Sequence, residues 1–313
     1  MRDVSMKSTT LRTAEARSVL HLDARTIAVI HAGDVPKGDP LPVAQVAAIQ
    51  AVKATSTIIP YCHPILIEHI DVQFEIMDAE IRSTVRVTAI ARTGVEMEAM
   101  TGASVAALTL YDMLKMIDED MHIGEVTLVN KRGGKSQYRE STPRILRAAV
   151  LVMSDSVASG EKKDSSGRMI QERLSAEGLE ICHYDIVPDE TATIVDRLKR
   201  YADEDDVDLV ITTGGTGFSP RDCTPEAMTQ VIEREIPGIP EAMRAYGQNR
   251  TPYAMLSRAR AGIRGQCIII NLPGSRGGVA DALDALFPSV IHSYRMLWMK
   301  PSNQHQSYED TTS

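Results

Sequence analysis

The chain has 313 residues, of which 43% are hydrophobic and 24% are charged, and its formal net charge is −8. This length suits two domains of ordinary size, and the composition is that of a globular protein. The acidic balance and the aromatic content of 4% argue against a nucleic-acid partner, which would need a basic face or stacking rings. The four cysteines are scattered, and neither a signal-peptide core nor a run of transmembrane length stands out. We therefore expect a cytoplasmic protein without a membrane partner.

The first half of the chain mixes helical and strand patterns. Residues 41–56 repeat apolar side chains every three or four positions, which predicts a helix. Residues 67–76 and 81–90 alternate in hydrophobicity, which predicts two antiparallel strands, each with one buried face. A second helix is expected over 96–117 and a further strand over 123–130.

The pattern changes after the polar segment 131–145, which carries glycine and proline and is the best candidate for a linker. Short apolar runs then follow, each succeeded by a loop and a helical segment: 147–154, 181–188, 207–213 and 266–271. This alternation of short apolar runs with helical segments is typical of a parallel sheet that is covered on both faces.

These patterns divide the chain into two domains joined near Pro143. We expect the first to be a ferredoxin-like α+β domain, in which helices cover an antiparallel sheet. The second is expected to be a three-layer α/β domain with a mostly parallel sheet. The expected boundaries are residues 1–140 for the first domain, 141–147 for the linker, 148–302 for the second domain and 303–313 for a disordered tail.

Ionisable residues recur near the ends of the 96–117 helix. Because a helix turns once every 3.6 residues, Glu98, Asp112 and Lys115 are predicted to share one face. Asp112 and Lys115 are three residues apart, and a buried acid–base pair of this kind can transfer protons. Taken singly, such features have ordinary structural explanations: a surface ion pair, a hydrogen-bonded histidine in a turn at His63, and a hairpin at the Gly-Gly-Lys of 133–135.

The order of these features resembles the MoaC family, the cyclic pyranopterin monophosphate synthases. The resemblance covers about residues 1–138 and rests on DVSMK (3–7), KGD (37–39), IQAVK (49–53), IPYCHP (59–64), TGVEMEAM (93–100), ASVAALTLYDMLK (103–115) and GGKS (133–136). It implies a lyase that needs no cofactor and converts (8S)-3',8-cyclo-7,8-dihydroguanosine 5'-triphosphate to cyclic pyranopterin monophosphate and pyrophosphate.

The residue types fit that chemistry, because a triphosphate needs cations and a rearranging ring needs an acid and a base. The catalytic residues that the resemblance implies are Lys53, Asp112 and Lys115. The substrate-binding residues that it implies are Tyr61, Cys62, His63, Glu96, Met97, Glu98 and Lys135.

Two glycine turns in the second half follow apolar strands. Glycines in the first, 213–217, let backbone N–H groups approach a phosphate closely. Thr224 is expected to cap the next helix, with Pro225 at its first position. The second turn, 271–275, also precedes a helix, and such loops meet at the carboxyl edge of a parallel sheet, where ligands bind.

Two carboxylates accompany these turns. Asp189 and Asp222 could hold Mg²⁺ together with nucleotide phosphates. The alternative is that Asp189 caps a helix and that the GGTG sequence marks only a tight loop, since it matches neither the dinucleotide fingerprint nor the P-loop pattern.

The second half resembles the MoaB/Mog family of molybdopterin-binding domains over about 146–300. The motifs are VMSDSVASG, VPDE, TTGGTGFSPRDCTPEAM, IPG, TPYAMLSRARAGIRG and INLPGS. The resemblance implies transfer of AMP from ATP to molybdopterin with Mg²⁺ as cofactor, catalysed by Asp189 and Asp222. The implied substrate-binding residues are Gly214, Gly215, Thr216, Gly217, Ser257, Asn271, Pro273, Gly274 and Ser275.

An alternative for the second half is a non-catalytic molybdopterin-binding or assembly module. The residues after the second turn, SRGG (275–278), depart from the Asn/Gln-Pro of many relatives. The expected partners are therefore small pterin and nucleotide substrates, and other enzymes of molybdenum cofactor biosynthesis. Relatives of the first half form hexamers and relatives of the second form trimers, so we expect a homo-oligomer, a hexamer.

Overall fold

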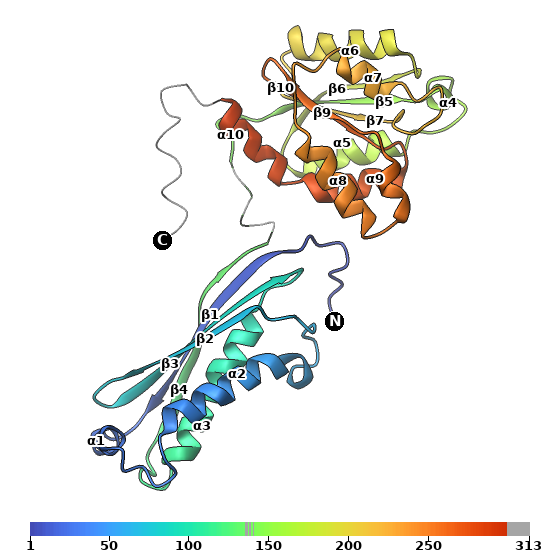
Figure 1. Ribbon diagram of the computed structural model, residues 1–313. Coiled ribbons are helices and arrows are strands. Elements are labelled where there is room, and N and C mark those ends of the chain that lie inside the picture. The colour runs from blue at the N-terminus through green and yellow to red at the C-terminus, as the bar shows by residue number, and fades with distance from the viewer. Residues whose placement is uncertain (135–136, 138, 140, 299–313) are drawn as a thin grey trace. The chain divides into compact units, whose positions relative to one another are not determined.

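The computed structural model describes residues 1–134, 137, 139 and 141–298. The chain forms two compact units, Met1–Gln137 and Tyr138–Ser313, and each is described by itself (Figure 1). The expected tail, 303–313, lies outside the described residues. Within the described ranges, no helix is both long enough and apolar enough to cross a membrane.

The first unit is an antiparallel sheet of four strands in the order β2-β3-β1-β4. Its elements are β1 (Thr10–His21), α1 (Ala24–Ala32), α2 (Pro40–Ile58), β2 (His69–Ile76), β3 (Glu80–Ala91), α3 (Glu96–Leu114) and β4 (His122–Arg132). Apart from the short α1, the connections follow a β-α-β-β-α-β pattern. The central strand β1 pairs with β3 along its whole length, although the hydrophobic alternation had not predicted a strand there.

Small side chains let the long helices approach this sheet closely. Alanines of α2 and α3 pack with valines and alanines of the strands in one buried cluster. A Cβ atom on Gly102 of α3 would lie 2.7 Å from Cγ2 of Val52 on α2. The close packing holds α2 and α3 firmly against each other, so the positions of side chains along α3 are well defined.

The second unit is built on a six-stranded sheet in the order β6-β5-β7-β10-β9-β8. Its elements are β5 (Arg147–Met153), α4 (Asp155–Ala158), α5 (Ser166–Ala176), β6 (Glu180–Val187), α6 (Thr191–Asp203), β7 (Leu209–Thr213), α7 (Thr224–Thr229), β8 (Arg234–Glu235), α8 (Gly238–Gln248), η2 (Pro252–Leu256), β9 (Ala261–Arg264), β10 (Cys267–Leu272), α9 (Arg276–Leu286), η3 (Ser289–His292) and α10 (Ser293–Leu297). Strands β6, β5, β7 and β10 are parallel, which confirms the mostly parallel sheet predicted from the four apolar runs. The added strands β9 and β8 are antiparallel.

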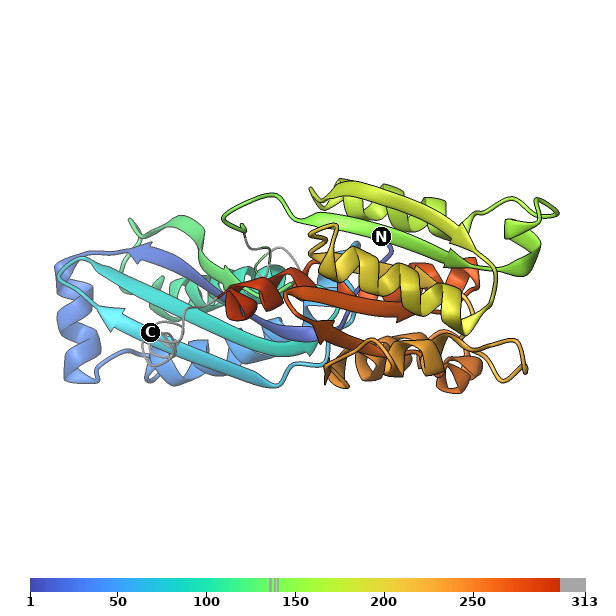
Figure 2. The same ribbon diagram turned by 90° about the horizontal axis from the view of Figure 1, so that it is seen from above.

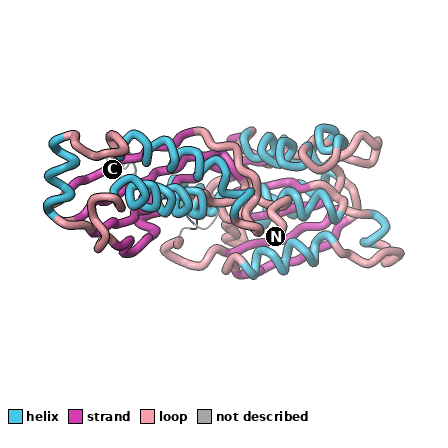
Figure 3. Tube along the Cα trace, turned by 90° about the horizontal axis from the view of Figure 1, so that it is seen from below, coloured by secondary structure: helices cyan, strands magenta, loops and turns pink. Residues whose placement is uncertain are grey.

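Both faces of this sheet are covered. Helix α6 lies over one face (Figure 2), and the opposite view shows helices over the other face (Figure 3). Alternate residues of β5 divide between two cores: Val150 packs in the cluster that contains α5 and α9, and Leu151 packs in the cluster that contains α6 and α7. A strand buried on both sides reads as a continuous apolar run, which is why the sequence revealed it.

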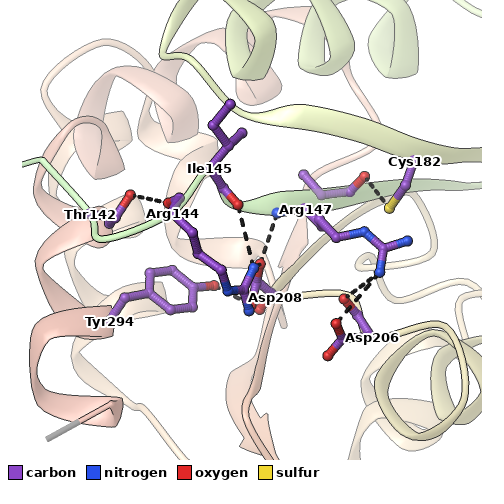
Figure 4. A network of polar contacts seen from close by, with 9 residues as sticks. Thr142, Arg144, Ile145, Arg147, Cys182, Asp206, Asp208 and Tyr294 are labelled. Atoms are coloured by element: carbon purple, nitrogen blue, oxygen red, sulfur yellow. Dashed lines mark hydrogen bonds and ion pairs between the residues drawn. The ribbon is translucent and has the colours of Figure 1, made fainter.

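The second unit also holds the chain segment that leads into it (Figure 4). The side chain of Asp208 is only 3% exposed, and its two oxygens accept hydrogen bonds of 2.6 Å from the Arg144 guanidinium. The backbone N–H of Arg147 donates to the same carboxylate at 2.8 Å, and the Tyr294 hydroxyl donates to the Asp208 carbonyl at 2.7 Å. The Arg144 guanidinium also lies over the Trp298 ring, at 4.8 Å from its centroid. The chain is therefore anchored to the second unit from Arg144 onward.

Candidate active sites

The acid–base pair of the first unit lies where α3 ends. Asp112 accepts hydrogen bonds of 2.8 Å from both Lys115 and Lys37, and Lys37 also donates to the Asp112 carbonyl at 2.7 Å. The hydrogen bonds from Lys115 and then from Lys37 lower the pKa of Asp112 to about 2, and Asp112 in turn raises the pKa of Lys115. The KGD motif thus contributes a third member, Lys37, to which the sequence had assigned no role.

This pair is exposed, which corrects the prediction of a buried pair. The side chains of Asp112 and Lys115 are 56% and 53% exposed. The reason is that Leu110 and Leu114 occupy the inward positions of the last helical turns, and the helix ends at Leu114, before Lys115. In a single copy of the chain, water therefore reaches both members of the pair.

A second group of predicted residues lies at the start of α3. Glu98 is buried, and its burial raises its pKa. The pKa of Cys62 is also raised, first by burial and then by the negative charge of Glu98, so the Cys62 thiol and the Glu98 carboxyl are neighbours. Glu96 accepts from Lys131 at 3.1 Å, and Met97 is partly exposed.

The remaining predicted residues of this unit are more scattered. Tyr61 is 76% exposed, and Lys53 is exposed on α2. His63 is half-buried. Hydrogen bonds from Ser5 lower the pKa of Asp3, and His63 makes a smaller electrostatic contribution in the same direction. Lys135 lies outside the described residues.

The two groups on α3 are far apart. Glu98 and Asp112 are fourteen positions apart on one continuous helix, which at a rise of 1.5 Å per residue corresponds to about 21 Å. One small substrate therefore cannot contact both groups within a single chain.

A positively charged cavity of about 740 Å³ lies beside the second group, at the start of α3. Among its described lining residues, the cations are Arg2, Lys7, Arg12, Lys131 and Arg132, and the single carboxylate is Glu96. The cavity borders Gly133, where the chain turns with a φ of +111° and where a Cβ atom would lie 2.3 Å from the Leu11 carbonyl. The GGK turn thus needs glycine to pass beside β1.

In the second unit, the loops that follow β5, β6 and β7 bring three aspartates together. The backbone N–H of Asp155 donates to the Asp189 carboxylate at 3.2 Å, and the N–H of Asp189 donates to the Asp155 carboxylate at 3.0 Å. Arg221 binds Asp155 through Nε at 3.0 Å and Nη2 at 2.6 Å. Burial and then the charges of Asp155 and Asp222 raise the pKa of Asp189.

Asp222 is held in place by its own loop and by Arg258. Its Oδ2 accepts from the Ser219 N–H at 2.8 Å. The Arg258 guanidinium donates to the carbonyls of Asp222 and Gly217, at 2.6 and 2.7 Å. Arg258 therefore fixes the loop between the GGTG turn and α7, a role that the sequence did not reveal.

Oxygen atoms of three side chains face the GGTG turn. A Cβ atom on Gly215, where φ is +61°, would lie 2.3 Å from Thr224 Oγ1 and 3.3 Å from Asp189 Oδ1. A Cβ atom on Gly217 would lie 2.8 Å from Asp222 Oδ2. Carboxylate and hydroxyl oxygens are suitable ligands for Mg²⁺, so these residues fit a magnesium–nucleotide site.

Thr224 does not cap α7, in contrast to the prediction. The helix begins at Thr224 itself, Cys223 occupies the cap position, and Pro225 is the second helical residue. Thr224 is fully buried, and its hydroxyl has no hydrogen-bond partner among the described residues. Helix boundaries inferred from sequence are uncertain by a residue or two, and here one residue changes the role of the hydroxyl.

The second glycine turn lies next to the first. The Thr213 hydroxyl donates to the Pro273 carbonyl at 2.7 Å, and a Cβ atom on Gly274 would lie 3.3 Å from the Cα of Gly214. Asn271 is buried and donates to the Thr212 hydroxyl at 3.1 Å, so this amide joins two strands.

A cavity of about 460 Å³ extends from this turn between α8, η2 and α9. Ser257, Pro273 and Ser275 line it, so three residues predicted to bind substrate meet there. The Ser275 hydroxyl also accepts from the Gly278 N–H at 3.2 Å and caps α9. Thr216 is buried, and its carbonyl accepts from the Arg258 N–H at 3.0 Å.

Comparisons with known proteins agree with this division. Residues 1–134 match the profile described as "MoaC family", and residues 149–292 match the "Probable molybdopterin binding domain". The "Molybdenum cofactor biosynthesis bifunctional protein" of Chlorobaculum tepidum is 41% identical over 95% of this chain and 94% of that relative. The chain belongs to this bifunctional family.

Other relatives match one or both halves of the bifunctional protein. The protein of the same name from Synechococcus elongatus is 36% identical over 95% of this chain and 97% of that relative. The "Cyclic pyranopterin monophosphate synthase" of Listeria welshimeri is 50% identical over 44% of this chain and 86% of that relative. The crystal structure of the molybdopterin biosynthesis enzyme MoaB from Thermus thermophilus is 41% identical, covers 50% of this chain and 99% of that one, and has a TM-score of 0.48.

The sequence did not predict a role for several residues at these sites. Lys7 and Lys37 belong to motifs that were identified, so their positions were a usable signal. Arg12 lies on β1, which was not predicted, and Arg221 pairs with an aspartate 66 positions away. Such long-range pairs have no local signature in the sequence.

Proposed function

We propose that the first unit is a cyclic pyranopterin monophosphate synthase and that the second is a molybdopterin adenylyltransferase. The first reaction rearranges the cyclised dihydroguanosine triphosphate, expels pyrophosphate and closes a cyclic phosphate. The second joins AMP from ATP to molybdopterin and releases pyrophosphate. Membership in the bifunctional family supports the pathway, and the geometry of each unit supports the assignment of roles.

In the first unit, the positively charged cavity is the place for the triphosphate. Its cations include Lys7, Arg12 and Lys131, and clustered lysines and arginines bind phosphate oxygens through charge-assisted hydrogen bonds. The adjacent Cys62, His63 and Glu98 would contact the purine-derived ring. Lys115 would donate protons and Asp112 would accept them, as the hydrogen-bonded acid–base pair at the end of α3.

The separation along α3 supports a site shared between two copies of the chain. Glu98 and Asp112 are too far apart to act on one substrate within one copy, as their spacing on the helix requires. If α3 of a second copy brings its Asp112 and Lys115 to the Glu98 end of the first, the site is complete and the exposed pair loses water. This arrangement requires an oligomer and is consistent with the hexamer that we propose.

In the second unit, the observation that carries the proposal is the convergence of Asp189 and Asp222 on the GGTG turn. Bound Mg²⁺ would be held by these carboxylates and would neutralise charge on the phosphate chain. The backbone N–H groups of the turn would hold the phosphates, and the cavity lined by Ser257, Pro273 and Ser275 would hold the pterin.

The second candidate function of this unit is binding of molybdopterin without catalysis. The observation that favours this alternative is the sequence after Ser275, because the segment with Arg276 and Gly277 departs from the Asn/Gln-Pro of many relatives. The adjacent cavity is nevertheless present. Under this alternative, the cavity would bind molybdopterin, and the aspartates would serve only to hold the loops together.

An adenylylation assay separates the two alternatives. Full-length protein is incubated with molybdopterin, ATP and Mg²⁺, beside an Asp222→Ala variant. Formation of adenylylated molybdopterin by the wild type, with loss in the variant, supports the transferase. Tight molybdopterin binding by both proteins with product from neither would replace the transferase with a binding module.

A further inference from the structure

Within the described residues, the buried hydroxyl of Thr224 lacks a hydrogen-bond partner, although polar side chains lie near it. Thr224 is the first residue of α7 and has no exposed surface. Its hydroxyl has no hydrogen bond among the described residues, whereas buried hydroxyls are normally paired because an unpaired one costs free energy. An unpaired buried group is often found where a bound ion or ligand supplies the missing partner.

The geometry of the GGTG turn places a carboxylate oxygen of Asp189 near this hydroxyl. The position that a Gly215 Cβ would occupy is 2.3 Å from Thr224 Oγ1 and 3.3 Å from Asp189 Oδ1. The Thr224 hydroxyl and an Asp189 carboxylate oxygen therefore both lie against Gly215, which leaves no room for a side chain there. The φ of +61° at Gly215 further disfavours any other residue.

We propose that the Thr224 hydroxyl is the third protein oxygen ligand for the divalent cation bound by Asp189 and Asp222. The inference rests on the proposed function of the second unit. Mg²⁺ prefers oxygen ligands, and in P-loop phosphate sites a threonine or serine hydroxyl ligates it. The geometry assigns the same role to Thr224 on a different loop.

The third carboxylate nearby does not fill this role. Asp155 is bound by two nitrogens of Arg221, at 3.0 and 2.6 Å. Within the described part of the chain, no three acidic, histidine or cysteine side chains are arranged to hold a metal ion. The protein's third ligand is therefore a hydroxyl, and water and phosphate oxygens complete the coordination.

Thr224→Val tests the assignment, because valine keeps the shape of threonine and removes only the hydroxyl. Since that hydroxyl makes no hydrogen bond within the described residues, the free energy of unfolding of the second unit should stay the same or rise. Affinity for Mg²⁺ alone, measured by isothermal titration of the full-length protein, should fall about tenfold or more, as in other perturbed metal sites. Thr224→Ser should retain the wild-type affinity.

Thr55→Val in the first unit is the matched control. Thr55 is equally buried, but its hydroxyl donates to the Ala51 carbonyl at 3.0 Å. This variant should lose stability and keep its affinity for Mg²⁺, the reverse of Thr224→Val.

The outcomes test separately the assignment of Thr224 as a metal ligand and the proposed function of the second unit. A wild type that binds neither Mg²⁺ nor Mg²⁺–ATP would overturn both proposals. If the wild type binds Mg²⁺ and Thr224→Val binds it equally well, only the ligand assignment fails. The assignment also fails if Thr224→Val weakens only the binding of metal-free ATP, because the hydroxyl would then donate a hydrogen bond to a phosphate. It fails as well if Thr224→Val loses as much stability as Thr55→Val.

Discussion

The two units of this chain assemble their candidate sites in different ways. In the second unit, Asp189 follows β6, whereas the GGTG turn and Asp222 follow β7, and the two loops meet at one edge of a mostly parallel sheet. In the first unit, Glu98 and Asp112 lie near opposite ends of one helix. Parallel strands bring distant segments to a common edge. A long helix spreads its residues along its axis, which is why we propose that the first site is completed by a helix end from another copy.

The difference extends to burial. Asp189 in the second unit has its pKa raised by burial, because its own chain already covers part of the carboxylate. Asp112 in the first unit is open to water and has its pKa lowered by two lysines. Under our proposal, the open site of the first unit loses water only when a second copy of the chain binds.

The largest expected effect is loss of lyase activity in Lys115→Ala. If Lys115 transfers a proton in the reaction, its removal should lower the lyase kcat by roughly 10²–10⁴-fold. Formation of cyclic pyranopterin monophosphate by the purified variant measures this. Arg25→Ala removes an equally cationic but highly exposed side chain of the same unit and serves as the control. Wild-type turnover in Lys115→Ala would remove this residue from the mechanism.

Mixing two inactive variants tests whether the first site is shared. Glu98→Gln and Lys115→Ala damage opposite ends of α3, so mixed pairs of copies should contain one intact site and restore roughly a quarter of the wild-type activity. The variants are unfolded together, refolded and assayed. In the second unit, an Asp189→Ala and Asp222→Ala mixture should restore no adenylylation, because both residues belong to one chain's site. If the first mixture restores no lyase activity, the first site is not shared between copies. If the second mixture restores adenylylation, the second site does not belong to one chain.

A smaller effect is expected from Arg144→Ala, which removes the anchor of the second unit. The variant leaves the buried Asp208 carboxylate with fewer donors, and since Arg144 itself is half exposed, the loss should be roughly 1–3 kcal/mol. Urea unfolding should show a lower midpoint for the second unit and no change for the first. An unchanged midpoint would show that the ion pair does not stabilise the unit.

The smallest effect concerns the titration of Asp112 in the ligand-free protein. Its folded pKa of about 2 lies below the ordinary value of 3.8, so its stabilising contribution is fully present above pH 3.8 and is lost as the pH falls toward 2. The carboxyl ¹³C signal should therefore titrate near pH 2. Lys115→Ala and Lys37→Ala should each raise that pKa. A midpoint near 4 in the wild type would mean that neither lysine holds the carboxylate.

Much of the second unit could be predicted from the sequence, because its buried strands are continuous apolar runs and its ligand loops follow them directly. Strand β1 of the first unit could not. Over residues 14–18 its buried positions are the small residues Ala14, Ala16 and Ser18, and charged residues alternate with them, so only the last buried positions, Val19 and Leu20, are large and apolar. Small side chains bury little surface and give a weak hydrophobic signal, although they are what allows α3 to pack closely.

The candidate sites were predictable to the extent that their residues form local motifs. The ion pairs Lys37–Asp112 and Arg221–Asp155 join distant segments of the chain. The Thr224 hydroxyl has no hydrogen-bond partner among the described residues, and no local sequence pattern reveals this. Thr224 shows the limit most clearly: the residue type is visible in the sequence, but its role changes with a shift of one position in the helix start.

The most direct test of two active sites in one chain is to assay both reactions on the same three preparations: wild type, Lys115→Ala and Asp222→Ala. The wild type should form both cyclic pyranopterin monophosphate and adenylylated molybdopterin. Lys115→Ala should lose only the first product, and Asp222→Ala only the second. A wild type that forms a single product, or a variant that loses both while remaining folded, would contradict two independent enzymes.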